Sequence, residues 1–180
     1  GVIELDMSFP DGRGFPGVGF RIIDNSNFEH FYVRPHQSGN PDATQYTPVF
    51  NNYAGWQLYH GAGYSEATPL KPDEWHHIKI DIHGLEAEIY FDDMSKPLIK
   101  VTGLKQGWKG NNIALIPGNL STRFANVQYT IKQGNAPAAK TVPANGTDGL
   151  ITRYQVSQQV NRNFFQDKPQ LTAQMKSTLK

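Results

Sequence analysis

Cysteine is absent from the sequence, and its absence excludes several kinds of chemistry. Without thiols the chain forms no disulfide, holds no metal through thiolates and has no cysteine nucleophile. A bacterial exported protein built without cross-links fits this composition as well as a cytosolic protein does. Cysteine usage therefore leaves the compartment open.

An excess of charge of one sign is also missing. The 180 residues include 17 Lys and Arg against 16 Asp and Glu, so the net charge is +1. A balance of this kind creates no broad field to attract nucleic acid or an anionic membrane. We therefore expect neither of them as a partner.

Long apolar runs are the third feature that the sequence lacks. No run approaches the ~20 residues of a transmembrane helix, and no basic, apolar and small-residue signal sequence opens the chain. We expect no insertion into a membrane. The first residues are already strand-like, which leaves open a signal peptide or a strand before them.

Alternation of apolar and polar residues is what the sequence does contain, in short segments that Gly, Pro, Asn and Asp separate. The clearest pair is residues 75–83 and 86–92, joined as a hairpin. The first three alternating segments predict a meander. Short strands with regular turns predict an all-β fold, a two-sheet antiparallel jelly-roll sandwich. The other expected strands span residues 2–8, 17–24, 27–36, 45–50, 56–60, 98–101, 112–116 and 123–131.

One expected strand, residues 27–36, has two unlike faces. Phe31 and Val33 point to one side, as core residues do, while rings, imidazoles and a guanidinium gather on the other. Solvated sheet faces more often carry Thr, Ser, Lys and Glu, so the polar side is a candidate binding face. The structural alternative is that these side chains only cover the sheet and that the guanidinium pairs with a nearby carboxylate. The candidate residues are His30, Tyr32, Arg34 and His36.

The expected strand 56–60 adds two residues to this face. If it buries Trp56 and Leu58, then Gln57 and Tyr59 join the polar side. A bulge would reverse the register and turn Trp56 toward the groove in place of Tyr59.

The composition changes after Ile131. Residues 133–149 hold Pro, Ala, Gly and Asn but almost no bulky apolar residue, which is typical of a linker. We therefore expect a sandwich over residues 1–132, a linker over 133–149 and a C-terminal extension over 150–180. The extension is too short for a core of its own, so it either docks on the sandwich or begins a further domain.

Several segments, in the order in which they occur, resemble the concanavalin A-like lectin/glucanase superfamily; they include GVGFR, NFEHFYVRPH, WHHIKIDIH and EAEIYFDD. More narrowly, they are similar to the laminin-G-like and 3-keto-disaccharide-hydrolase-like domains of bacterial exported proteins. The resemblance covers residues 2–131. It implies a concanavalin A-like jelly roll whose concave sheet or rim loops bind carbohydrate, and a secreted or periplasmic location.

The first hypothesis is a carbohydrate-binding module of a larger exported protein, with carbohydrate as its partner. Sugars present flat apolar C–H faces and rings of hydroxyls, so a site needs aromatic platforms beside donors and acceptors. Tyr32 and Tyr59 are expected to stack on a sugar. The residues expected to bond its hydroxyls are His30, Arg34, His36 and Gln57.

Two alternatives stay open. A glycoside hydrolase of the keto-sugar or glucanase type needs two carboxyl groups across the scissile bond. Glu4 and Asp6 match the start of a glucanase E-x-D-x-x-E motif, but Phe9 stands at its third acidic position. Glu29 is in phase with Phe31, which places it on the apolar side of its strand. The other alternative is a non-catalytic structural module that packs on a neighbouring domain through the same face.

No metal or other cofactor is expected. His76 and His77 are adjacent, so they point to opposite faces of a strand, and no histidine or carboxylate cluster has ligand spacing. Calcium is the one alternative, because the resemblance implies sites made of Asp and backbone oxygens in loops. The candidate loops contain Asp92 and Asp93, or Asp24 with Asn25 and Asn27.

Overall fold

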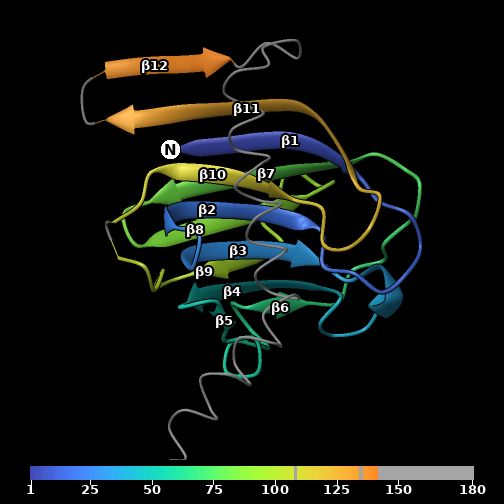
Figure 1. Cartoon of the computed structure of the whole chain (residues 1–180). Coiled ribbons are helices and arrows are strands. Elements are labelled where there is room, and N and C mark those ends of the chain that lie inside the picture. Colours follow the sequence, from blue (N-terminus) through green and yellow to red (C-terminus); the bar gives the residue numbers. More distant parts are fainter. Residues whose placement is uncertain (108, 134–135, 142–180) are drawn as a thin grey trace, which may run out of the picture.

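The computed structural model describes residues 1–107, 109–133 and 136–141, and within these ranges the chain forms two antiparallel β-sheets packed face to face (Figure 1). Sheet A has the strand order β12-β11-β1-β7-β8-β9. Its strands are β1 (Val2–Ser8), β7 (His76–His83), β8 (Glu86–Phe91), β9 (Ile99–Val101), β11 (Arg123–Gln133) and β12 (Ala136–Thr141).

Sheet B has the order β10-β2-β3-β4-β5, and β6 also pairs with β4. A single 3₁₀ turn, η1 (Pro35–Gln37), is the only helical element of the described residues. The all-β, two-sheet antiparallel jelly-roll sandwich expected from the sequence is confirmed. The strands of sheet B are β2 (Gly17–Asp24), β3 (Asn27–Val33), β4 (Thr44–Phe50), β5 (Tyr53–Ala54), β6 (Ser65–Glu66) and β10 (Asn112–Ile116).

The main core lies between the two sheets and follows the period of two. Ile3, Leu5 and Met7 of β1 are buried in it, and Phe31 and Val33 of β3 meet them from the other sheet. Alternate residues of a strand point to opposite faces, so the polar residues of β3 lie on the outer face of sheet B. The predicted division of this strand into a core side and a polar side is therefore confirmed.

The prediction of an N-terminal meander is wrong. β1 pairs with β7 and β11 in sheet A, whereas β2, β3 and β4 form the meander in sheet B. Residues 9–16, which contain two prolines, separate β1 from β2. Antiparallel hairpins are mostly closed by about two to five residues, and this longer connection instead crosses from one sheet to the other.

Two further strand predictions differ from the structure. β3 ends at Val33 because Pro35 opens η1, so the expected strand does not continue to His36. Residues 56–60 form no strand: the amides of Leu58 and Tyr59 donate to the Gly55 carbonyl at 2.8 and 3.1 Å, which closes a turn.

The structure describes only part of the segments for which a linker and a C-terminal extension are expected, and both stay predictions. β12 lies within the expected linker 133–149 and pairs along β11, from Gln133 opposite Ala136 to Gln128 opposite Thr141. The rest of that segment and the expected extension 150–180 lie outside the described residues.

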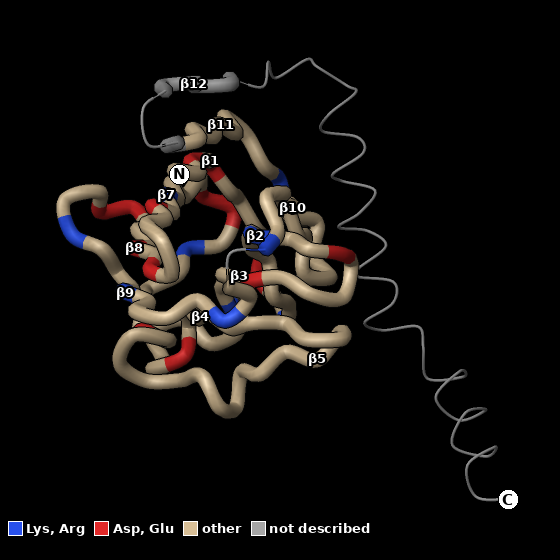
Figure 2. Tube along the Cα trace, turned by 90° about the vertical axis from the view of Figure 1, so that its left-hand side faces the viewer, with Lys and Arg blue, Asp and Glu red and all other residues tan. Residues whose placement is uncertain are grey.

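Charges are scattered over both sheets and their loops, as Figure 2 shows along the described trace. No helix in the described ranges has the length and apolarity that a membrane span requires.

Candidate functional site

A cavity of about 380 Å³ opens on the outer face of sheet B. Its floor comes from β3 and its neighbours, and its walls come from the loops at one end of the sheet. The lining residues are Arg13, Phe15, Phe28, His30, Tyr32, Arg34, His36, Gln37, Asp42, Val49, Ala54, Trp56, Ile116 and Gly118.

The floor is built by the register of β3 on β4. His30 stands opposite Thr47 and Tyr32 opposite Gln45, so the polar side chains of both strands share the outer face. The His30 ring lies 4.9 Å from the Tyr32 ring and 6.0 Å from that of Phe28, measured between centroids. The alternation of β3 thus produces a continuous row of rings along the cavity floor.

One wall is made by the connection between β1 and β2. The Phe15 amide donates to the Gly118 carbonyl at 2.9 Å, which fastens this connection to the loop after β10. Gly118 has a φ of 66°, and a Cβ there would overlap the backbone of Phe15 and Pro16. Only glycine therefore allows the two loops to close in this way.

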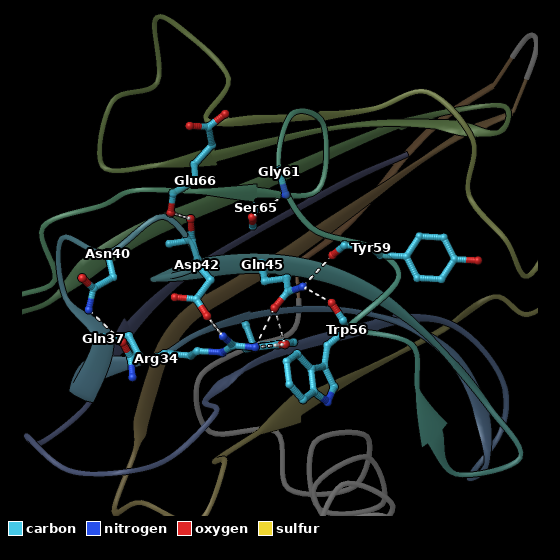
Figure 3. A network of polar contacts seen from close by, with 12 residues as sticks. Arg34, Gln37, Asn40, Asp42, Gln45, Trp56, Tyr59, Gly61, Ser65 and Glu66 are labelled. Carbon is cyan, nitrogen blue, oxygen red and sulfur yellow. Dashed lines mark hydrogen bonds and ion pairs between the residues drawn. The ribbon is translucent and has the colours of Figure 1, made fainter.

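The Arg34 guanidinium lies in the cavity lining beside Tyr32 and Trp56. Its Nη1 forms an ion pair with Asp42, and its Nη2 donates to Gln45 Oε1 at 2.7 Å (Figure 3). The guanidinium carbon lies 5.4 Å from the ring centroids of both Tyr32 and Trp56, within the range of cation–π attraction. Arg34 is thus held by a carboxylate, as the structural alternative expected, and it also lines the cavity.

Gln45 links the floor to the loop that carries Trp56. Its Oε1 accepts hydrogen bonds from Arg34 and, at 2.7 Å, from the Tyr32 hydroxyl. Its Nε2 donates to the carbonyls of Trp56 and Tyr59 at 2.9 and 2.5 Å (Figure 3). All of its hydrogen-bonding capacity is therefore used: Oε1 holds Tyr32 and Arg34, and Nε2 fixes the turn against the sheet.

Three buried polar atoms of the cavity residues have no hydrogen-bond partner in the described part of the protein. They are Nε2 of His30, Nε of Arg34 and Nδ1 of His36. Buried polar atoms are nearly always bonded, because an unpartnered one loses its hydration without compensation. Their gathering around one cavity marks it as a place where hydrogen-bonding groups of another molecule fit.

Burial shifts the pKa of three residues that line the cavity, His30, His36 and Tyr32. Desolvation lowers the pKa of His30 to about 3, so its imidazole is neutral at pH 7 and has one donor and one acceptor nitrogen. Burial, followed by the charges of Arg13 and Arg34, also lowers the pKa of His36. Burial raises the pKa of Tyr32 to about 12, although Arg34 opposes this shift, and its hydroxyl stays protonated.

The structure brings four of the six expected site residues into the cavity and leaves two outside. His30, Tyr32, Arg34 and His36 line it, whereas Gln57 and Tyr59 do not. The cause is the turn at residues 55–59, which replaces the expected strand. Trp56 lines the cavity, as the alternative register foresaw, and the Tyr59 ring packs on Tyr64, 5.4 Å away.

Sequence reasoning missed the residues that loops supply. Arg13, Phe15 and Asp42 lie outside the strands, where alternation carries no information. Gln45 was also missed, although its place opposite Tyr32 follows once the strand pair is aligned. The pattern of β4 offered that signal.

Carboxyl groups are scarce in the cavity. Asp42 is the only carboxyl-bearing residue among the described residues that line it. Glu29 lies on the inner side of β3, where it accepts hydrogen bonds from the Tyr46 hydroxyl at 2.7 Å and the Gln106 amide at 2.8 Å. Asp6 is engaged by His77 in sheet A. Neither acid reaches the cavity.

The described residues contain no group of three or more His, Asp or Glu that is placed to hold a metal ion. Among the calcium candidates, Asp92 contacts Nδ1 of His76 at 2.8 Å and accepts from the His77 amide at 2.9 Å. Asp93 and Asp24 accept hydrogen bonds within their own turns.

These features define the class as a two-sheet antiparallel β-sandwich with an aromatic-lined cavity on the outer face of one sheet. Neither a protein-family model nor a curated protein matches the chain. The solved structures that share the fold include a carbohydrate-binding module and a galectin. The carbohydrate-binding module CBM66 from Bacillus subtilis is 20% identical with a TM-score of 0.50, over 70% of this chain and 71% of that one. The Caenorhabditis elegans galectin LEC-6 is 11% identical with a TM-score of 0.50, over 71% of this chain and 81% of that one. The chain therefore shares the β-sandwich fold of these two proteins.

Proposed function

We propose that this chain is a carbohydrate-binding module and that the sugar occupies the cavity of sheet B. The observation that carries the proposal is the set of three unpartnered buried polar atoms in a cavity lined by aromatic rings. Sugar recognition needs this combination, because a pyranose offers apolar C–H faces for stacking and hydroxyls that both donate and accept. The names of the two structural neighbours, a carbohydrate-binding module and a galectin, support the same proposal.

The proposed roles follow from position and exposure. Trp56, which is 45% exposed, offers its indole as the stacking platform, and the buried Tyr32 ring forms the floor. The free nitrogens of His30, Arg34 and His36 bond the hydroxyls. Gln57 and Tyr59 have no part in this site, because they do not line the cavity.

The proposal is one of binding without turnover. Glycoside hydrolysis uses two carboxyl groups that flank the scissile bond. Of the described residues that line the cavity, Asp42 alone has a carboxyl, and the Arg34 guanidinium holds it. A hydrolase of the keto-sugar or glucanase type would therefore need acids from elsewhere.

The wider setting that we propose is a module of a larger exported bacterial protein, secreted or periplasmic and of the laminin-G-like kind. The chain contains no cysteine, which suits an exported protein built without disulfides. If no glycan binds, the third alternative is favoured, a structural module that docks on a neighbouring domain through this face.

The test is a glycan array on the purified chain, followed by titration calorimetry of the best ligand with two tryptophan variants. We expect Trp56→Ala to weaken binding about tenfold or more, because it removes the stacking platform. Trp75→Ala is the matched control, since Trp75 is 53% exposed but lies outside the cavity. Equal effects of the two changes, or none, would refute the proposed site.

A further inference from the structure

We propose that the sugar recognised by this cavity carries a carboxylate, as uronic acids do, and that Arg13 binds it. This inference rests on the function proposed above. Its starting point is an imbalance of charge among the cavity residues, which include two guanidinium groups, Arg13 and Arg34, and one carboxylate, Asp42.

The single carboxylate is already used. Asp42 forms an ion pair with Arg34, whose side chain is 8% exposed. Arg13 is exposed and makes no hydrogen bond or ion pair with another described residue. The acidic residue nearest to it in the sequence, Asp11, accepts a hydrogen bond from the Gly12 amide at 2.8 Å. The cavity therefore has one positive charge, that of Arg13, without a carboxylate partner among its described residues.

The charge of Arg13 lies beside the free hydrogen-bonding atoms. Arg13, Arg34 and His36 all line the same cavity, and the charges of the two arginines help to lower the pKa of His36. The Phe15 ring is 5.8 Å from the His36 ring and 5.8 Å from the Arg34 guanidinium carbon. One wall of the cavity thus combines a free guanidinium with Nδ1 of His36 and Nε of Arg34, which have no partner in the described chain.

A carboxylate fits this wall better than a further hydroxyl does. A guanidinium presents its N–H groups as a planar fork that matches the two oxygens of a carboxylate, and the resulting hydrogen bonds are charge-assisted. A hydroxyl would satisfy a donor but leave the charge of Arg13 uncompensated. Because the net charge of the whole chain is only +1, with acidic and basic residues scattered (Figure 2), a preference for acidic sugars must come from the cavity itself.

The experiment compares oligosaccharides of glucuronate, galacturonate and mannuronate with their own methyl esters, which keep the shape and remove the charge. We expect the best acid to bind about tenfold tighter than its ester at low salt, with a smaller ratio at high salt. Arg13→Gln should bring the ratio close to one. Arg123→Gln should keep it, because Arg123 lies outside the cavity, 3.8 Å from Asp73.

The possible outcomes separate this inference from the proposed function. Equal binding of an acid and its ester, lost in Trp56→Ala, would overturn the carboxylate and leave sugar binding intact. An acid preference that survives Arg13→Gln would overturn the role of Arg13. A sulfated neutral oligosaccharide that binds as tightly as the uronate would overturn the preference for a carboxylate, because the cavity would then recognise negative charge alone. Failure of every glycan, neutral or acidic, would overturn the proposed function itself.

Discussion

His30 is the residue whose state depends most on its burial. It lies in the cavity floor between the rings of Phe28 and Tyr32, and its pKa falls to about 3 because the folded protein excludes water from it. The neutral imidazole is useful for binding, since it supplies both a donor and an acceptor. The same burial makes it a source of acid sensitivity.

We expect this residue to destabilise the fold as the pH falls from about 6.5 toward 3. In that window the imidazole of the unfolded chain, with an ordinary pKa of 6.5, binds a proton, whereas the imidazole of the folded chain stays neutral. Above pH 6.5 the imidazole is neutral in both states, so His30 costs no stability. Below pH 6.5 the free energy of unfolding falls by up to about 1.4 kcal/mol per pH unit. Urea unfolding across this range measures it.

The control for this prediction is an exposed histidine. His30→Gln should flatten the pH dependence between 6.5 and 3, whereas His60→Gln, in an exposed position of a loop, should leave it unchanged. If both variants keep the slope of the parent chain, the acid sensitivity belongs to other groups.

The strand pair β2–β3 is the element on which the cavity floor depends. Gly17 in β2 stands opposite Tyr32 in β3, and a Cβ there would lie 2.6 Å from the Tyr32 Cα and overlap the Phe31 carbonyl. A Cβ added at Gly19, on the same strand, would instead meet side chains, 3.3 Å from Cδ1 of Ile116 and 3.5 Å from the Phe28 ring. The two glycines thus differ in what surrounds them.

Gly17→Ala is expected to be the more damaging change, because the backbone atoms around Gly17 can move less than the side-chain atoms around Gly19. We expect it to lower the free energy of unfolding by about 3 kcal/mol, at the upper end of overpacking effects. Gly19→Ala should change it by less than about 1 kcal/mol. Chemical denaturation followed by circular dichroism compares them, and similar losses would show that the β2–β3 spacing is not the constraint.

Strands were predictable from the sequence where side chains alternate. The expected bounds of β1, β2 and β10 match the structure, and the period of β3 placed His30 and Tyr32 together. Loops were not predictable, because their course depends on contacts between distant residues. Trp56 lines the cavity from a turn in which its carbonyl accepts a hydrogen bond from Gln45, and no local pattern around residue 56 encodes that bond.

At the scale of the whole molecule, the core formed by the described residues draws on strands and loops that end well before Thr141. Among the described residues, every member of the main core cluster, and every partly buried residue packed against it, lies between Ile3 and Tyr129. We therefore expect a chain cut after Thr141, at the end of β12, to fold cooperatively and to unfold within about 4 °C of the full chain. Scanning calorimetry of both chains decides this. A much lower temperature would show that later residues pack on the sandwich.

The three unpartnered atoms of the cavity imply a conflict between activity and robustness. A site that keeps polar groups ready for a ligand forgoes the stability that a well-packed apolar surface would give at the same positions. Selection for heat resistance alone should therefore replace His30 and His36 by apolar residues early, and it should abolish recognition in doing so. If ligand binding is selected together with heat resistance, the positions that then stay unchanged would identify the binding site independently of the structure.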